Sequence, residues 1–374
     1  MSARPGGCVP ALFGTSERDD ESSMAAKKRR VIGGVDTHGK THHGAAIDQV
    51  GRVLGDREFP ATPAGYRALL AWLRSFGVVV KVGVEGTGTY GAGLARYLSG
   101  EAVEVVEVDR PDRKTRHRKG KSDPIDAIAA AQAVLSGRAS GVPKTRTGPV
   151  EAIRVLRAAR RGAVKARTAA LNQLHGLLVS APDALHTELA DLTPVQLVRR
   201  CANLPVDENR MADPVNATAA ALRAIAQRVQ GFDAEIAQAD KRLRPVVAKT
   251  APRLSALFGV GPDVAAQLLT TAGDNPDRLH SEAALAHLCG VAPIPASSGR
   301  TDRHRLNRGG DRAANNALHT IALCRMRYDP RTRAYVQRRT KQGLTKKEIL
   351  RCLKRYITRD VYTALQADFP TLRT

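Results

Sequence analysis

The sequence is poor in aromatic and in acidic residues, and both shortages limit what the protein can do. Aromatic side chains make up only 4% of the 374 residues, so stacking of bases on aromatic platforms is not expected to be the main contact with a partner. Lys and Arg number 59 against 36 Asp and Glu, a formal net charge of +23. Such a surface attracts polyanions, and nucleic acid bound through its phosphates is the predicted partner. A basic protein with no such partner is the alternative.

Paired cysteines and long apolar runs are also missing. The five cysteines show no CxxC spacing, so neither a disulfide framework nor a zinc site is predicted, and a reducing cytoplasm is the expected location. No stretch approaches the roughly 18 apolar residues of a membrane span, so no membrane partner is expected. Hydrophobic residues still make up 43%, enough for a buried core. Residues 1–29 predict a disordered leader, with Met24 as an alternative start.

Residues 30–145 carry the pattern of an α/β domain. VIGGVD (31–36) is an apolar run ending in a carboxylate, and it predicts the first of three strands in a meander. The next helix is well marked, because Thr62 suits an N-cap and Pro63 the first helical position. The remaining pattern predicts helices at 61–76, 89–100 and 123–137 and strands at 78–86 and 102–109. This βββαβαβα order describes a ribonuclease-H-like (RuvC-like) α/β fold.

The middle region, residues 146–250, predicts long helices. Residues 150–180 are rich in Ala, Arg and Leu at helical spacing. A second helix has apolar residues at alternating steps of three and four, typical of a coiled coil: Leu222, Ile225, Val229, Phe232, Ile236, Ala239, Leu243 and Val246. A helical hairpin folded on its own chain explains the same seam equally well. Pro245 predicts that the seam ends or kinks there.

The last region, residues 251–374, is expected to be mainly α-helical. In GVGP, Gly259 and Gly261 precede an apolar-periodic helix that starts at Pro262. This resembles a helix-hairpin-helix turn, whose backbone N–H groups grip a DNA phosphate. An ordinary loop is the alternative. The loop that follows carries basic side chains expected to contact phosphates, unless they are simply solvated: Arg300, Arg303, Arg305 and Arg308.

Four carboxylates stand at the ends of predicted strands or at the start of a predicted helix: Asp36, Glu85, Asp123 and Asp126. In a ribonuclease-H-like sheet the first and fourth strands are neighbours and the last helix packs across their ends, so the four should converge. Converging carboxylates need cations to stay ionised. Two Mg²⁺ ions, or Mn²⁺ as the alternative, about 4 Å apart would stabilise displacement at a phosphodiester. Taken singly, each carboxylate has an ordinary structural role as its alternative, such as an N-cap for Asp123.

A basic run at 113–121 directly precedes this acidic pair. It would flank the phosphates of a substrate while the carboxylates hold the metal ions. The residues expected to do so include Arg118, Lys119 and Lys121.

Several stretches resemble the insertion sequence 110 family of bacterial transposases. GVDTHGKTH, VEGTGTYG and KGKSDPIDA resemble the family's N-terminal DEDD domain. GVGPDVAAQLL and GVAPIPASSGRTDRHRLNRGGDR resemble its second, serine-bearing domain. The two motif sets stand in the family's order and cover the chain from about residue 30 to about residue 360. The leader before Arg30 has no expected counterpart in the family.

The resemblance implies a recombinase that cuts and rejoins target and donor DNA under the guidance of a structured noncoding RNA. It makes the four carboxylates the catalytic metal ligands. The family's catalytic serine stands just before a glycine, which matches Ser298 in ASSG, with Ser297 as the alternative. Without the resemblance, Ser298 would be a turn residue before Gly299. A homo-oligomer, dimer or tetramer, joined through the coiled coil near the bacterial nucleoid is also implied.

Three other functions fit parts of the pattern. A Holliday-junction resolvase-like nuclease would use the four carboxylates and water, with both serines dispensable. A sugar-kinase or actin-like ATPase shares the fold, but it needs a second glycine-rich phosphate loop for which GVGPD is a poor substitute. An RNA-binding scaffold without activity would fit if the carboxylates were structural, and failure to bind Mg²⁺ would favour it.

Overall fold

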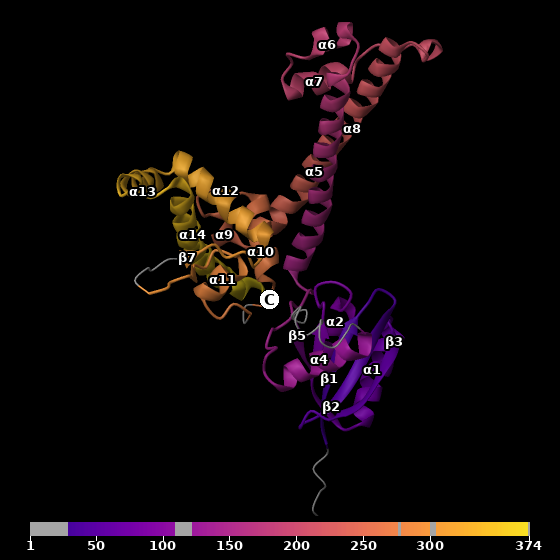
Figure 1. Ribbon diagram of the computed structural model, residues 1–374, viewed down its shortest axis with the longest axis vertical. Helices are drawn as coiled ribbons and strands as arrows, with labels where there is room; N and C mark the ends of the chain where they lie inside the picture. The colour runs from indigo at the N-terminus through magenta and orange to yellow at the C-terminus, as the bar shows by residue number, and fades with distance from the viewer. Residues whose placement is uncertain (1–28, 109–121, 276–277, 300–303, 373–374) are drawn as a thin grey trace, which may run out of the picture.

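The computed structural model describes residues 29–108, 122–275, 278–299 and 304–372. Figure 1 shows an α/β unit and a helical C-terminal unit side by side, with a long helical hairpin rising away from both. None of the described helices is long and apolar enough to cross a bilayer. Residues 1–28 of the expected leader (1–29) and the basic run at 113–121 lie outside the described residues.

The α/β unit is built on one five-stranded mixed sheet in the order β3-β2-β1-β4-β5. The first three strands are antiparallel neighbours, whereas β1, β4 and β5 run parallel. The strands are β1 (Arg30–Thr37), β2 (Thr41–Asp48), β3 (Val53–Pro60), β4 (Val78–Glu85) and β5 (Glu104–Val108). The predicted βββαβαβα order and the pairing of the first strand with the fourth are confirmed.

Helices cover both faces of this sheet. On one face α1 (Pro63–Ser75) and α2 (Ala92–Gly100) share a core with β1 and β4. On the other face α4 (Asp123–Leu135) packs against the sheet. The predicted start of α1 is confirmed, because the Thr62 hydroxyl accepts a hydrogen bond from Gly65 N at 3.2 Å.

A glycine brings α4 into direct contact with the central strand. A Cβ added at Gly34 would lie 2.2 Å from Ala127 O and 2.3 Å from Ala131 N. The backbone of α4 therefore rests on the backbone of β1, with no room for a side chain between them. This close approach fixes the start of α4 beside the carboxyl end of β1.

The predicted long helices of the middle region form a hairpin within the chain. Helix α5 (Pro149–Val179) and helix α8 (Pro214–Thr250) lie side by side, and the short helices α6 (Asp183–Leu189), α7 (Pro194–Cys201) and η1 (Glu208–Arg210) follow one another at the tip. The seam residues Leu222 and Val229 are buried in one core with Leu174 of α5. The hairpin alternative thus accounts for the seam, and a coiled coil between copies stays a prediction. Helix α8 continues through Pro245 to Thr250, so the proline does not end it.

Two ion pairs hold the hairpin in register. The guanidinium of Arg160 contacts the Asp240 carboxylate at 2.6 Å, and Arg167 pairs with Asp233 in the same way two turns further on. Both pairs join α5 to α8.

The C-terminal unit is mainly helical, as predicted. Its core is formed by apolar faces of its longer helices together with the ends of α5 and α8. The elements are α9 (Pro252–Ser255), α10 (Pro262–Ala272), α11 (Glu282–Leu288), β6 (Ile294–Pro295), β7 (His304–Arg305), α12 (Arg312–Tyr328), α13 (Pro330–Lys341), α14 (Lys346–Asp368) and η3 (Phe369–Leu372).

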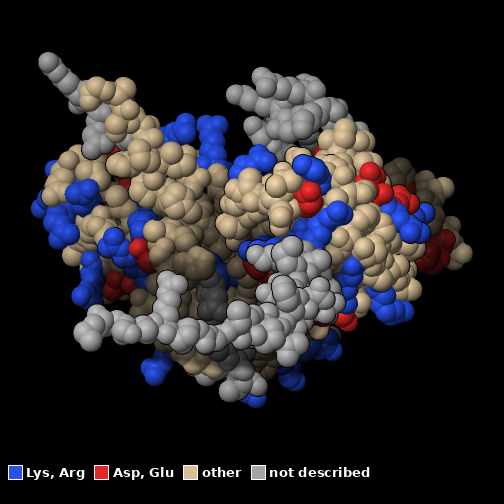
Figure 2. Space-filling view, turned by 90° about the horizontal axis from the view of Figure 1, so that it is seen from below, with Lys and Arg blue, Asp and Glu red and all other residues tan. Residues whose placement is uncertain are grey.

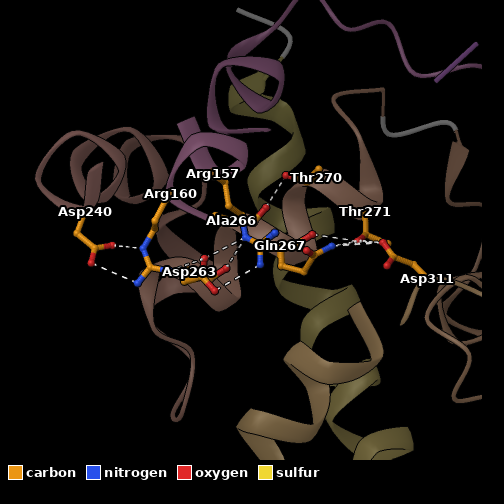
Figure 3. Close-up of polar contacts among 9 residues, drawn as sticks. All are labelled: Arg157, Arg160, Asp240, Asp263, Ala266, Gln267, Thr270, Thr271 and Asp311. Carbon is orange, nitrogen blue, oxygen red and sulfur yellow. Dashed lines mark hydrogen bonds and ion pairs between the residues drawn. The ribbon is translucent and has the colours of Figure 1, made fainter. Parts of the chain in front are cut away.

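Helix α10 joins the hairpin to the rest of this unit (Figure 3). At its start, the Asp263 carboxylate forms an ion pair with the Arg157 guanidinium of α5 at 3.1 Å. Near its end, Thr271 and Gln267 donate to one carboxylate oxygen of Asp311, at 2.6 and 3.3 Å. The other oxygen of Asp311 caps α12, so one carboxylate ties two helices together.

Polar contacts also join the α/β unit to the C-terminal unit. Arg278 reaches Val142 O at 2.6 Å and the Glu107 carboxylate, at the end of β5, at 3.5 Å. Thr145 donates to Asp274 at 2.6 Å, and the ammonium of Lys144 donates to Thr270 O. Burial, and then the nearby Arg278, lowers the pKa of Lys144 to about 8.

Candidate metal centre and serine hairpin

Two of the predicted acidic residues meet in space, and a histidine lies between them. His38 Nε2 is 3.2 Å from Asp36 Oδ2 and 3.3 Å from Asp123 Oδ1. One potential ligand atom from each of the three residues lies within 4.8 Å of the others. The three come from the end of β1 and the first turn of α4, elements that are far apart in the sequence.

The local fold explains this convergence. Asp36 is in the buried central strand and is only 7% exposed. Asp123 is the first residue of α4, and Ser122, not Asp123, stands at the N-cap position. The contact of α4 with Gly34 places that helix start at the end of β1. Thr37 then ties β1 to β4 by donating to the backbone oxygen of Glu85 at 2.8 Å.

The geometry around His38 is that of a ligand set. Its Nε2 atom is buried and makes no hydrogen bond of good geometry within the described parts of the chain, although two carboxylate oxygens stand close to it. A cation shared by three converging donors would satisfy all of them at once. Two carboxylates and an imidazole suit a divalent ion such as Mn²⁺, and carboxylates also suit Mg²⁺.

The other two predicted ligands, Glu85 and Asp126, lie on neighbouring positions of the same sheet edge and helix, but they are not members of this three-residue group. Glu85 ends β4, the parallel neighbour of β1. Asp126 lies one turn into α4 and is buried, at 5% exposed. The carboxylates of both residues lie outside the three-residue cluster, so full convergence of the four carboxylates stays a prediction.

His38 was missed by the sequence argument. The available signal was its spacing, because residues two apart along an extended strand point to the same side. His38 follows β1 directly and stands two residues after Asp36. Because the metal site was predicted from carboxylates alone, the imidazole in the same motif was not included.

The predicted serine lies in a different part of the molecule. Strands β6 and β7 form a short hairpin, and Ser298 is exposed in the segment that joins them. Gly299 after it has φ +57°, a left-handed conformation that favours glycine. Figure 1 shows β7 on the side of the C-terminal unit away from the sheet. Within one chain the hairpin and the acidic cluster are therefore apart.

The predicted phosphate-binding turn before α10 is exposed at Gly261 and half-buried at Gly259. Gly259 has φ +84°, and Gly261 stands at the N-cap of α10 with no heavy atom within 4 Å of an added Cβ. A phosphate could approach the first N–H groups of α10 from this side. Asp263 in the same first turn opposes an anion, although its charge is already paired with Arg157.

Basic side chains cover much of the described surface. Figure 2 shows Lys and Arg over both the α/β unit and the C-terminal unit, with Asp and Glu sparser on this face. Arg305 and Arg308 are exposed, as a phosphate contact requires. The other basic residues predicted to bind nucleic acid lie outside the described residues: Arg118, Lys119, Lys121, Arg300 and Arg303.

Two protein-family models match the chain, one over the part that contains the acidic cluster and one over the part that contains the serine hairpin. A transposase model for the DEDD domain of IS110 matches residues 33–181, and the model for the transposase IS116/IS110/IS902 family matches residues 251–337. The chain belongs to the IS110 family of transposases. The first match spans Asp36 and Asp123, and the second spans Gly259 and Ser298. No curated protein matches the chain.

This IS110-family transposase is therefore an enzyme that acts on DNA. Its DEDD domain implies the use of a divalent metal ion, and the Asp36–His38–Asp123 cluster is a group that could hold one.

Proposed function

We propose that this transposase cuts and rejoins DNA strands with a divalent-metal site on the α/β unit and Ser298 as the nucleophile. The observation that carries the proposal is the meeting of Asp36 and Asp123 oxygens at the buried Nε2 atom of His38. That arrangement lies in the domain for which the family implies metal-dependent chemistry on DNA.

We infer a ribonuclease-H-like fold for the α/β unit. The inference is supported by the sheet order β3-β2-β1-β4-β5, with three antiparallel strands followed by two parallel ones. It is also supported by α4 across the sheet, with its first turn beside the end of β1. Domain boundaries at residues 30–145, 146–250 and 251–374 form part of the same proposal.

In this proposal Asp36, His38 and Asp123 would hold the ion, and Glu85 and Asp126 are the remaining predicted ligands. The bound ion, Mg²⁺ or Mn²⁺, supplies Lewis-acid stabilisation of charge on the oxygens of a phosphodiester. The buried position of Asp36 limits access of water to its carboxylate. The imidazole of His38 distinguishes this set from an all-oxygen one and favours Mn²⁺ as a test ion.

The serine supplies the covalent step. Ser298 Oγ attacks the phosphorus of the DNA backbone, its proton passes to a base, and the bond from phosphorus to the leaving sugar oxygen breaks. The resulting phosphoserine ester retains the energy of the broken bond, so attack by the hydroxyl of another DNA end can rejoin strands. Because the hairpin and the acidic cluster are apart within one chain, we assign them to different copies in a dimer or tetramer. The α5–α8 hairpin, with partly exposed Phe232 and Ile236, is the proposed contact between copies.

In this proposal a structured noncoding RNA selects the DNA sites. This part of the proposal rests on membership of the family. Recognition by base pairing would leave the protein to bind backbones. The net charge of +23 and the low aromatic content suit a protein that binds phosphate backbones while the RNA recognises the bases. The proposed location is the bacterial cytoplasm, at the nucleoid.

A recombination assay tests the proposal. The protein is incubated with the flanking DNA of its element, the element's own noncoding RNA and Mg²⁺, and products are run on a denaturing gel. A protein–DNA adduct that disappears in Ser298→Ala but persists in Ser297→Ala supports Ser298 as the nucleophile. Cleavage without an adduct, unaffected by either serine change but abolished by Asp36→Ala, would instead identify a junction nuclease that uses water.

Mixing two inactive variants tests the assignment to different copies. Ser298→Ala and Asp36→Ala proteins are each expected to be inactive alone. A mixed oligomer contains sites that combine an intact serine from one copy with an intact acidic cluster from another, so adduct formation should return. If mixing restores nothing while each variant still binds DNA, both groups must come from the same copy.

A further inference from the structure

A cavity lies in the C-terminal unit, beside the base of the serine hairpin. Its volume is about 770 Å³, and its walls come from three separated stretches of the sequence. One stretch leads into β6, the second contains β7, and the third is one face of α14. The cavity is thus continuous with the hairpin that carries Ser298 but lies outside the acidic cluster.

The α14 wall of the cavity carries a row of cations. Arg351, Arg355 and Arg359 follow one another at intervals of four residues, so they share one helix face. At a rise of about 1.5 Å per residue the row spans about 12 Å. Lys354 and Arg305 add two further cations to the lining. Such a row is longer than a single phosphate and suits a chain of phosphates.

Acidic groups compensate only part of this row, because Glu282 of α11 pairs with Arg355 and lies 3.7 Å from Arg359. Among the described lining residues Glu348 is the one carboxylate, and it is engaged at the start of α14, where it accepts from Thr345 N at 2.8 Å. Neither Arg351 nor Lys354 forms an ion pair with another residue of the described ranges. Burial, and then the neighbouring Arg351, lowers the pKa of Lys354, as expected for a cation that lacks an anionic partner.

The basic groups are nevertheless held in place. Arg355 donates to the Glu282 carboxylate of α11 at 2.9 Å, and Lys354 donates to Asn315 Oδ1 of α12 at 2.8 Å. These contacts fix two of the cations before any ligand arrives, which lowers the entropy cost of binding. The cavity is therefore preorganised for an anion and is not a loose surface cluster.

An aromatic side chain completes the cavity. Tyr356 lines it and is 50% exposed. The guanidinium of Arg359 lies over its ring, 5.6 Å from the centroid. A tyrosine stacked with an arginine offers a flat surface to a nucleobase beside the cationic row.

We propose that this cavity binds the phosphodiester backbone of the DNA strand that is presented to Ser298. The proposal rests on the proposed function for the identity of that strand. The row on α14 would hold phosphates next to the reacting one, and Tyr356 would contact an unpaired base. A strand held beside the hairpin would keep its scissile phosphate close to the exposed Ser298.

Salt-dependent binding tests the proposal without any catalysis. A fluorescent single-stranded DNA is titrated with full-length protein in EDTA at several salt concentrations, with an RNA of the same sequence as a second probe. Replacing Arg351 and Arg359 by Gln should lower the slope of log affinity against log salt by about 1.4, because each phosphate contact on a single strand contributes about 0.7. At about 0.1 M salt this corresponds to roughly 10- to 100-fold weaker binding of DNA. The matched control is Arg331→Gln with Arg333→Gln on α13, two exposed arginines outside the cavity, which should change the slope less.

Two further variants distinguish the effect of lost charge on DNA binding from effects on folding and on the covalent step. Arg351→Lys combined with Arg359→Lys keeps the charge, so this variant should retain the parent slope. Ser298→Ala should bind like the parent, because the cavity, not the nucleophile, holds the strand. If no covalent adduct forms in the recombination assay but the Gln variant still weakens DNA binding, the assignment of Ser298 as nucleophile is wrong and the cavity proposal still holds. The proposal is overturned if the Gln variant and the α13 control have equal slopes, or if only the RNA slope changes.

Discussion

Gly34 gives the sharpest test of how the metal centre is built. An alanine there would place its Cβ 2.2 Å from Ala127 O and 2.3 Å from Ala131 N, both in the backbone of α4. Because non-bonded heavy atoms are in contact at about 3.5 Å, the helix would have to retreat by roughly 1 Å. Forcing such a change on a packed core costs about 1–3 kcal/mol.

The same movement should weaken metal binding. Asp123 stands on α4 and Asp36 on β1, so a retreating helix separates the two carboxylates that meet at His38. A displacement of about 1 Å at a reacting group can cost about 100-fold in rate. We expect Gly34→Ala to lower Mn²⁺ affinity at least tenfold and to lower strand cleavage further.

Trp72 makes the stability part of this prediction measurable. It is the single tryptophan of the chain and packs against Phe59 and Phe76 in the α/β unit. Its fluorescence therefore follows unfolding of that unit. A loss of about 2 kcal/mol should lower the midpoint by roughly 8 °C for a unit of this size.

The matched control is Gly100→Ala at the end of α2, where no heavy atom lies within 4 Å of an added Cβ. It should leave both the midpoint and the Mn²⁺ affinity close to those of the parent. If Gly34→Ala behaves like Gly100→Ala in both measurements, the packing of α4 on β1 does not build the site.

Three further changes have expected outcomes. His38→Gln should weaken Mn²⁺ binding by about tenfold or more in a spectroscopic titration, because an imidazole ligand is lost, and unchanged affinity would exclude it as a ligand. Asp311→Asn should lower the free energy of unfolding by about 1–2 kcal/mol in denaturant, because Thr271 and the start of α12 lose a charged acceptor. The pKa of Lys144 is about 8 in the folded chain against an ordinary 10.5, so folding releases its proton in this interval and the free energy of unfolding should rise with pH from 8 to 10.5, by up to about 3 kcal/mol. Lys144→Met should flatten that rise, and an unchanged profile would mean that Lys144 is solvated.

Local patterns were enough to predict the α/β elements. The apolar run before Asp36 is buried as the central strand, and the N-cap at Thr62 starts α1 as expected. These features depend on residues that are close in the sequence, so local sequence patterns are sufficient to predict them. The meeting of Asp36 with Asp123 could also be predicted, because the expected fold packs the last helix across the end of the first strand.

Features that depend on distant residues could not be predicted in the same way. The apolar spacing at Leu222 and Val229 is the same whether the helix packs against its own chain or against another copy. In the structure these residues pack against α5. Pro245 lacks a backbone N–H, yet packing of α8 on α5 carries the helix past it. The basic cavity joins Arg305 to a face of α14 that is almost fifty residues away, and no motif records that proximity.

The ion pairs of the α5–α8 hairpin constrain how the length of this chain can change during evolution. Arg160–Asp240 and Arg167–Asp233 are spaced by seven residues on each helix, in opposite chain directions. One inserted residue would rotate everything beyond it by about 100° and separate a pair. Insertions or deletions of seven residues, matched in both helices, would keep the pairs facing each other and would change the distance from the tip to the DNA-acting units by about 10 Å. Homologues should therefore differ in arm length in matched steps of two turns, while unmatched changes collect in the loops at the tip.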